Sequence, residues 1–195
     1  MILRPVYIMG SLFVAASAIM LFTHPTARRV LSHSNAMGRV TIDASNATAW
    51  FRAMKPYCNP VEVEAWHQWS PPPATDQGAG YSAACYALAG KIDRSRELIL
   101  TVPQEEQWRA AGIVFNVAHP VADAGDDESA GPIMELVLEF WPNHYMALYH
   151  AGMSSYILGN HARARTHLQE FLRHYNQKDG WRSNALTVLG YLEEK

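Results

Sequence analysis

Cysteine is scarce in this chain of 195 residues, which contains only Cys58 and Cys85. Two cysteines are too few for a disulfide-rich scaffold, and neither lies in a CxxC, CxxCH or Cys/His metal-binding spacing. One bridge between them, in an oxidising compartment, would close a loop of about 27 residues and stabilise the fold by about 3 kcal/mol. Two separate, small buried side chains fit the sequence equally well.

Charge is also sparse, since only 17% of the residues are charged and the formal net charge is −2. The 16 lysines and arginines form no long basic run. Phosphate binding needs a concentrated basic footprint, so we expect no nucleic-acid partner. Hydrophobic residues make up 49% of the chain, which is typical of a folded protein rather than a disordered one.

Motifs for catalysis and cofactor binding are absent as well. The chain has no G-x-S-x-G motif, Walker loop or kinase signature. Gly78 to Ala83 matches G-x-G-x-x-A, but a dinucleotide loop must follow a buried strand, and here a proline-rich stretch precedes it. The acidic stretch after Asp123 places Gly125 and Met134 where an EF-hand needs ligands. We therefore predict no enzyme activity, no catalytic residues, no cofactor and no small-molecule substrate.

Three histidines crowd the stretch SSYILGNHARARTHLQEFLRHY, at His161, His167 and His174. The last two are seven residues apart, which separates them by about 10 Å along a helix. One metal ion does not readily bridge that distance, whereas an i, i+4 spacing would allow it. We expect these side chains, and the neighbouring arginines, to face solvent or a partner.

The first 23 residues resemble a transmembrane anchor. Val6 to Phe22 carries no charge and spans roughly 26 Å as a helix, close to the thickness of a bilayer core. The alternative is a signal peptide cleaved near Ala16-Ser17-Ala18, but apolar residues continue past that site. We predict a single-pass protein of the inner (cytoplasmic) membrane that contacts the lipid bilayer through Val6 to Phe22. The soluble body is expected in the periplasm, where a cysteine pair would be oxidised.

Residues 24–73 read as a tether with a short capping helix. The stretch up to residue 45 is polar and has no sustained period. Asn46 to Tyr57 begins with cap-like residues and carries apolar side chains at helical spacing, so it predicts a short helix that ends at Pro56. From residue 74 to 195 every segment indicates a helix and none a strand, which predicts an all-α protein.

Internal repetition organises residues 74–195. The small residues Ala83, Ala118, Gly152 and Gly190 follow one another at intervals of 35, 34 and 38 residues. Seven residues after each of the first three comes a glycine, suited to the left-handed end of a helix. Five residues further on come small residues that would let paired helices approach closely: Ser95, Ala130 and Ala164. The pattern predicts three helical hairpins and a final helix from Arg182 to Glu194.

These residues resemble tetratricopeptide repeats, whose period is 34, and LYHAGMSSYILGNHARARTHLQEFL is closest to the family pattern. The family's aromatic positions are only partly kept, and residues 176–181 are inserted before the last helix. The resemblance implies a TPR-like solenoid whose first helix of each hairpin lines a surface for protein partners. The positions carried over as partner-binding are Phe115, His119, Tyr149, Met153 and Tyr191, with Tyr156 nearby.

A second resemblance concerns function. PYCNPVEVE, followed by YSAACYALAGKIDRSRELI, is similar to anchored repeat proteins of some phototrophic bacteria, where extrinsic accessory subunits brace a photosynthetic reaction centre against its antenna ring. We therefore expect a non-catalytic scaffold or accessory subunit that binds integral membrane protein subunits. A cell-envelope adaptor or assembly factor that recruits exported proteins transiently is the alternative. An enzyme or a pigment-binding subunit, with His24 or His33 as ligands, is a third possibility.

Overall fold

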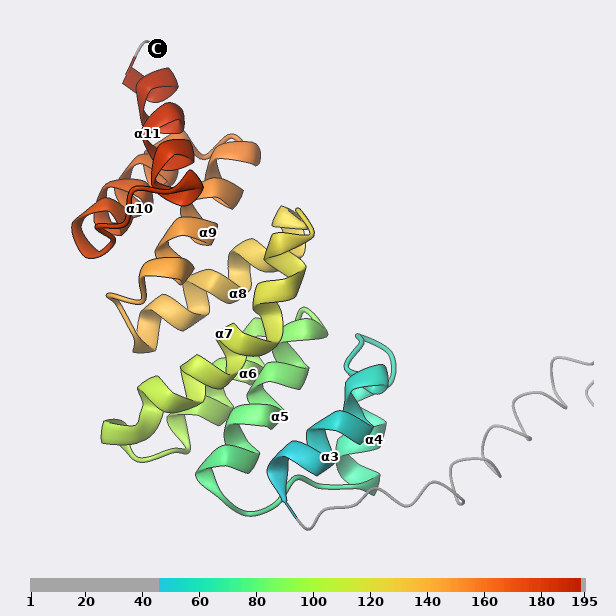
Figure 1. Cartoon of the computed structure of the whole chain (residues 1–195). Helices are drawn as coiled ribbons and strands as arrows, with labels where there is room; N and C mark the ends of the chain where they lie inside the picture. The colour runs from blue at the N-terminus through green and yellow to red at the C-terminus, as the bar shows by residue number, and fades with distance from the viewer. Residues whose placement is uncertain (1–45, 194–195) are drawn as a thin grey trace, which may run out of the picture. The chain divides into compact units, whose positions relative to one another are not determined.

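The computed structural model describes residues 46–193, and every regular element in that range is helical (Figure 1). The predicted all-α class is confirmed for these residues. The predicted anchor and the tether up to residue 45 lie outside the described range. Within residues 46–193, no helix combines the length and the apolar character needed to cross a membrane.

The elements follow one another along the domain from α3 to α11, as Figure 1 shows. The α-helices are α3 (Ala47–Met54), α4 (Val63–Trp69), α5 (Asp76–Leu88), α6 (Ile92–Leu100), α7 (Gln107–Asp123), α8 (Asp127–Phe140), α9 (Tyr145–Ile157), α10 (His161–His174) and α11 (Gly180–Glu193). Two short 3₁₀ turns, η1 (Lys55–Tyr57) and η2 (Gln104–Glu106), precede α4 and α7.

The N-terminal helices are built into the domain rather than standing apart from it. The Asn46 side chain accepts a hydrogen bond from the Ala49 N–H and begins α3, as predicted, and the helix gives way to η1 at Pro56. α3 packs on α5, and Cys58 is bonded to Cys85 within α5. The predicted boundary between residues 73 and 74 therefore divides one compact unit, because a covalent bond and buried side chains cross it.

Each of the three hairpins turns through a glycine with a left-handed backbone. Gly90, Gly125 and Gly159 have φ angles of 72°, 78° and 79°. The residue after each glycine donates its N–H to a carbonyl five residues earlier, which closes the end of the first helix. The hairpins α5–α6, α7–α8 and α9–α10 therefore turn where the glycine spacing predicts.

Close helix packing also follows the predicted small residues. Ser95, Ala130 and Ala164 are fully buried, and the Ser95 hydroxyl donates to the Ala83 carbonyl at 2.8 Å. A side chain at Gly152 would place its Cβ 2.7 Å from Leu168, so only glycine allows α9 and α10 to approach this closely. The hairpins then stack through α5 on α7, α8 on α9 and α10 on α11.

The last helix departs from the predicted register. α11 begins at Gly180 rather than Arg182, where Asp179 accepts a hydrogen bond from the Arg182 N–H at 3.2 Å. Gly190, the fourth residue of the predicted series, is exposed, and a Cβ there would meet nothing within 4 Å. Ala185 is the buried small residue instead. The non-helical residues 175–179 shift the helix, which the spacing alone did not reveal.

Candidate functional site

The six predicted partner-binding residues divide into buried and accessible ones. Phe115 and Tyr149 are buried. The Phe115 ring lies 4.1 Å from that of His144, and Tyr149 meets the rings of Phe171 and Trp181 edge-on. Both residues therefore act as internal supports between helices in this chain, because neighbouring aromatic rings occupy the space in front of them.

The other four predicted residues retain accessible surface. His119, Met153 and Tyr156 are half-buried, whereas Tyr191 is 56% exposed. They come from α7, α9 and α11, the first helices of successive hairpins and the final helix. The accessible part of the predicted surface is therefore smaller than the sequence indicated, and Tyr191 is its most exposed member.

His119 belongs to a three-residue cluster that the sequence analysis did not identify. His119 and Asp123 lie one turn apart on α7, and His150 reaches them from α9. The Nε2 atoms of His119 and His150 are 3.5 Å and 3.6 Å from Asp123 Oδ1, and the three donor atoms lie within 4.8 Å of one another. Neither Nε2 atom has a hydrogen-bond partner, although both are buried.

The environment of the cluster is largely aromatic. The Phe115 ring stacks 4.8 Å from that of His119, and the Trp181 ring lies 5.8 Å from that of His150. Burial is the main reason that the pKa of His150 falls to about 4, with the nearby His119 acting in the same direction. The ring of His150 is therefore neutral at neutral pH and offers a lone pair.

The three histidines that crowd one stretch of the sequence, His161, His167 and His174, do not form a cluster. His167 Nε2 lies 2.9 Å from Glu135 Oε1 on α8, and His174 Nε2 lies 4.0 Å from Glu170 on its own helix. The ring of His161 lies 6.1 Å from that of Tyr156 and is tilted against it. The i, i+4 spacing of His119 and Asp123 is the signal that sequence reasoning missed, and His150 could be added only once α9 was placed against α7.

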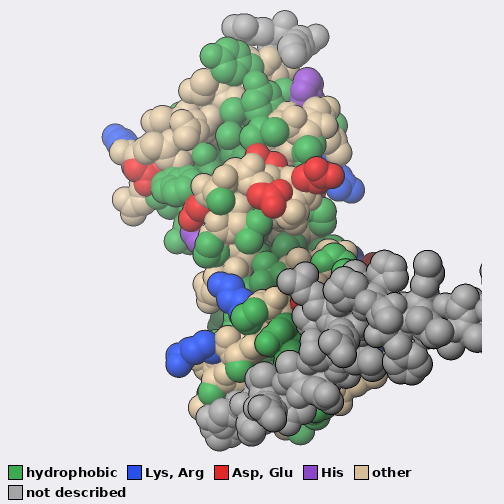
Figure 2. Space-filling model, turned by 90° about the vertical axis from the view of Figure 1, so that its right-hand side faces the viewer, with side chains coloured by type: hydrophobic (Ala, Val, Ile, Leu, Met, Phe, Trp, Pro, Cys, Tyr) green, Lys and Arg blue, Asp and Glu red, His purple; other side chains and the backbone are tan. Residues whose placement is uncertain are grey.

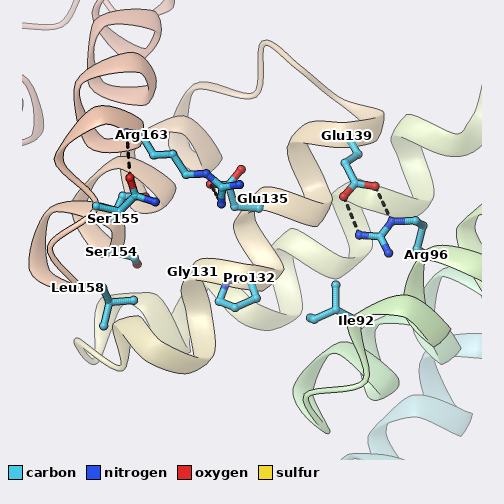
Figure 3. Close-up of a pocket in the computed structure, with 11 residues that line it drawn as sticks. Ile92, Arg96, Gly131, Pro132, Glu135, Glu139, Ser154, Ser155, Leu158 and Arg163 are labelled. Carbon is cyan, nitrogen blue, oxygen red and sulfur yellow. Dashed lines mark hydrogen bonds and ion pairs between the residues drawn. The ribbon is translucent and has the colours of Figure 1, made fainter.

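A groove of about 570 Å³ lies between α6, α8, α9 and α10 (Figure 3). Ion pairs line it: Arg96 binds Glu139 through two hydrogen bonds of 2.6 and 2.8 Å, and Arg163 lies 3.5 Å from Glu135. The hydrogen bond from His167 is the main cause of a lowered pKa of Glu135. The charges of this groove are thus paired by neighbouring hairpins, and the pairs brace α6, α8 and α10.

The disulfide region is a separate, closed cluster. His67 on α4 uses both ring nitrogens, one 2.8 Å from the Val63 carbonyl and the other 2.9 Å from the Ser82 hydroxyl on α5. Trp50 and Tyr86 pack on its ring. The bond between Cys58 and Cys85 joins the turn that precedes α4 to α5, so the sequence alternative of two free cysteines is wrong.

Neither family models, nor curated proteins, nor solved structures match this chain. The likeness to tetratricopeptide repeats and to phototroph accessory subunits thus remains a prediction from the residues.

Proposed function

We propose that this chain is a non-catalytic scaffold, an accessory subunit that binds the integral membrane subunits of a larger complex. The observation that carries the proposal is the repetition of one helix–glycine–helix unit, three times in succession, along residues 76–174. Repeated hairpins of this kind present an extended surface, which suits a protein partner better than a small molecule.

Exposed apolar side chains support a binding role. Large hydrophobic residues protrude from most of the helices, among them Trp69, Leu100, Trp108, Tyr145, Ile157, Leu158, Leu186 and Tyr191. On the face drawn in Figure 2, hydrophobic side chains lie among scattered charged ones, and no broad basic field covers the described atoms. Aromatic and aliphatic side chains of this kind are what the core of a protein interface uses.

The disulfide supports the proposed location. Bonds such as that between Cys58 and Cys85 persist in oxidising compartments, and the bacterial periplasm is one of them. We therefore propose a single-pass anchor at residues 1–23 in the inner membrane and a TPR-like repeat domain in the periplasm. The anchor would hold the repeats near their partner and raise their effective concentration there.

The partner we favour is a photosynthetic reaction centre within its antenna. This choice rests on the similarity of PYCNPVEVE and YSAACYALAGKIDRSRELI to accessory subunits of such complexes. In that setting the repeats would brace the outside of the pigment-binding subunits and would bind no pigment themselves.

The test is purification of the full-length chain from its native membranes in a mild detergent, followed by mass spectrometry of the proteins that remain bound. A scaffold subunit should be recovered in a fixed ratio with integral membrane proteins, and pigment absorption in that fraction would identify a photosynthetic partner. Recovery of the free chain would contradict the proposal. Recovery with many exported proteins in small amounts would instead favour the adaptor.

Two matched variants locate the binding surface. Tyr191→Ser removes the most exposed of the predicted contact residues, whereas Val61→Ser alters a side chain that is 87% exposed on the N-terminal side of the domain. We expect the first to reduce the recovered partner several-fold and the second to leave it unchanged. Equal recovery with both variants would mean that α11 lies outside the interface.

A further inference from the structure

The cluster of His119, Asp123 and His150 is unusual because its polar atoms face one another without bonding. Both Nε2 atoms are shielded from solvent and lack hydrogen-bond partners. His150 is only 5% exposed, so bulk solvent reaches little of its ring. An unpaired buried polar atom of this kind lowers the stability of the folded state by about 1–3 kcal/mol. Two such atoms in one place indicate that the site binds a ligand.

We propose that His119, Asp123 and His150 bind a divalent transition-metal ion, with Zn²⁺ as the ion that fits best. This goes beyond the scaffold role and does not depend on it. It also departs from the sequence prediction, which expected no metal. The donor set of two imidazoles and one carboxylate suits zinc and its first-row neighbours rather than magnesium or calcium, which prefer oxygen ligands alone.

The spacing of the donor atoms is close to the spacing that a single ion requires. Ligands about 2.0–2.1 Å from Zn²⁺ at a tetrahedral angle lie about 3.4 Å apart. The two nitrogen–oxygen separations of 3.5 Å and 3.6 Å are near this value, and all three donors lie within 4.8 Å of one another. Bringing the two imidazole nitrogens from the 4.8 Å limit to about 3.4 Å requires the His119 and His150 rings to move by at most about 0.7 Å each.

The helices fix this arrangement from two directions. His119 and Asp123 are held one turn apart on α7, and the aromatic stack of Phe115 on His119 orients that ring. His150 comes from α9, wedged between Tyr149 and Trp181. A bound ion would therefore tie the second hairpin to the third.

Access and coordination number both favour an open site. The Asp123 side chain is 44% exposed, so an ion can reach the cluster from solvent. Three protein ligands leave the fourth position of a tetrahedral ion to water or to a partner's side chain. The site thus differs from a closed, four-ligand structural zinc site.

The test uses the full-length chain without an affinity tag, stripped with EDTA and then titrated with ZnCl₂ in a calorimeter. We expect saturable binding of one ion per chain and a rise in the melting temperature when it binds. Addition of CoCl₂ to the stripped chain should produce visible d–d absorption bands, which report on nitrogen and oxygen ligands at the ion itself.

Asp123→Asn and His119→Gln each remove one ligand from a position that is partly exposed, so the fold should tolerate them. Each should weaken zinc binding more than the roughly 10- to 100-fold loss that follows removal of an outer-shell partner. His174→Gln is the matched control, because His174 and Glu170 share the i, i+4 spacing of His119 and Asp123 but lack a third ligand. It should bind zinc normally.

Three results would overturn the proposal. They are the absence of saturable binding in the stripped chain, binding that survives both Asp123→Asn and His119→Gln, and an equal loss of binding in His174→Gln. Unchanged circular dichroism of each variant shows that a lost signal reports on the ion rather than on unfolding.

Discussion

Two histidines in this domain, His67 (half-buried) and His150 (buried), have opposite surroundings. His67, beside the disulfide, has both ring nitrogens bonded to Val63 and Ser82. His150, between the second and third hairpins, has an Nε2 atom that is buried and unpaired. Folding gives both ring nitrogens of His67 a hydrogen-bond partner and leaves Nε2 of His150 without one. His67 therefore has a structural role, whereas His150 is available to bind a ligand.

The largest effect should come from the covalent bond on the His67 side. Replacing both Cys58 and Cys85 by alanine removes a bridge between residues 27 apart and should lower the free energy of unfolding by about 3 kcal/mol. The measurement is urea denaturation of the variant and of the parent chain. A loss below about 1 kcal/mol would mean that the disulfide adds little to the packing of α3 and α4 on α5.

Replacing each histidine by leucine should separate their roles. His67→Leu leaves the buried Ser82 hydroxyl without its partner and should destabilise the metal-free domain by about 1–3 kcal/mol. His150→Leu removes an unpaired nitrogen whose burial is unfavourable, and in EDTA it should leave the domain as stable as the parent chain or more stable. Denaturation of both variants under the same conditions provides the comparison, and similar losses would remove the distinction drawn between the two sites.

The free energy of unfolding should depend on pH partly through His67. Burial lowers the pKa of His67 below its ordinary value of 6.5, so the folded state holds the ring neutral while the unfolded state protonates it. The contribution to stability is therefore complete above pH 6.5 and declines as the pH falls below it, by at most about 1.4 kcal/mol per pH unit. Unfolding midpoints between pH 8 and pH 5 should fall less steeply in His67→Leu; parallel curves would contradict the assignment.

The smallest effect should come from the ion pairs of the groove. Arg96→Ala breaks the two hydrogen bonds to Glu139 that link the first hairpin to the second, yet the pair is partly exposed and should contribute less than about 1 kcal/mol. Arg94→Ala, which loses a pair within its own helix, is the control. A double-mutant cycle of Arg96 with Glu139 measures the coupling, and a value above about 2 kcal/mol would make the groove a major brace.

What the sequence predicted was mostly local. Gly90, Gly125 and Gly159 mark turns because a left-handed residue is needed at that one position, whatever the rest of the chain does. The small residues Ser95 and Ala164 follow five residues after the glycine, because the two helices of one hairpin pack closely at that point. Hairpin positions could therefore be predicted from spacing within a single repeat.

Contacts between two repeats could not be predicted from the sequence. His150 meets His119 only because α9 lies at a particular rotation and height against α7, and no local pattern encodes that register. Ala185 rather than Gly190 packs in α11 because the preceding non-helical residues change the phase of the helix. Phe115 and Tyr149 were expected at a partner surface, but neighbouring rings cover them.

The bond between Cys58 and Cys85 also determines how the domain carries mechanical load. A pull applied to residue 46 passes through α3 and then through the sulfur atoms into α5. The peptide segment from Pro71 to Pro73 is bypassed, so α4, which lies inside the loop that the bond closes, carries no load while the bond is intact. Under tension, the first contacts to give way must therefore lie outside this loop, either where α3 packs on α5 or on the C-terminal side of α5.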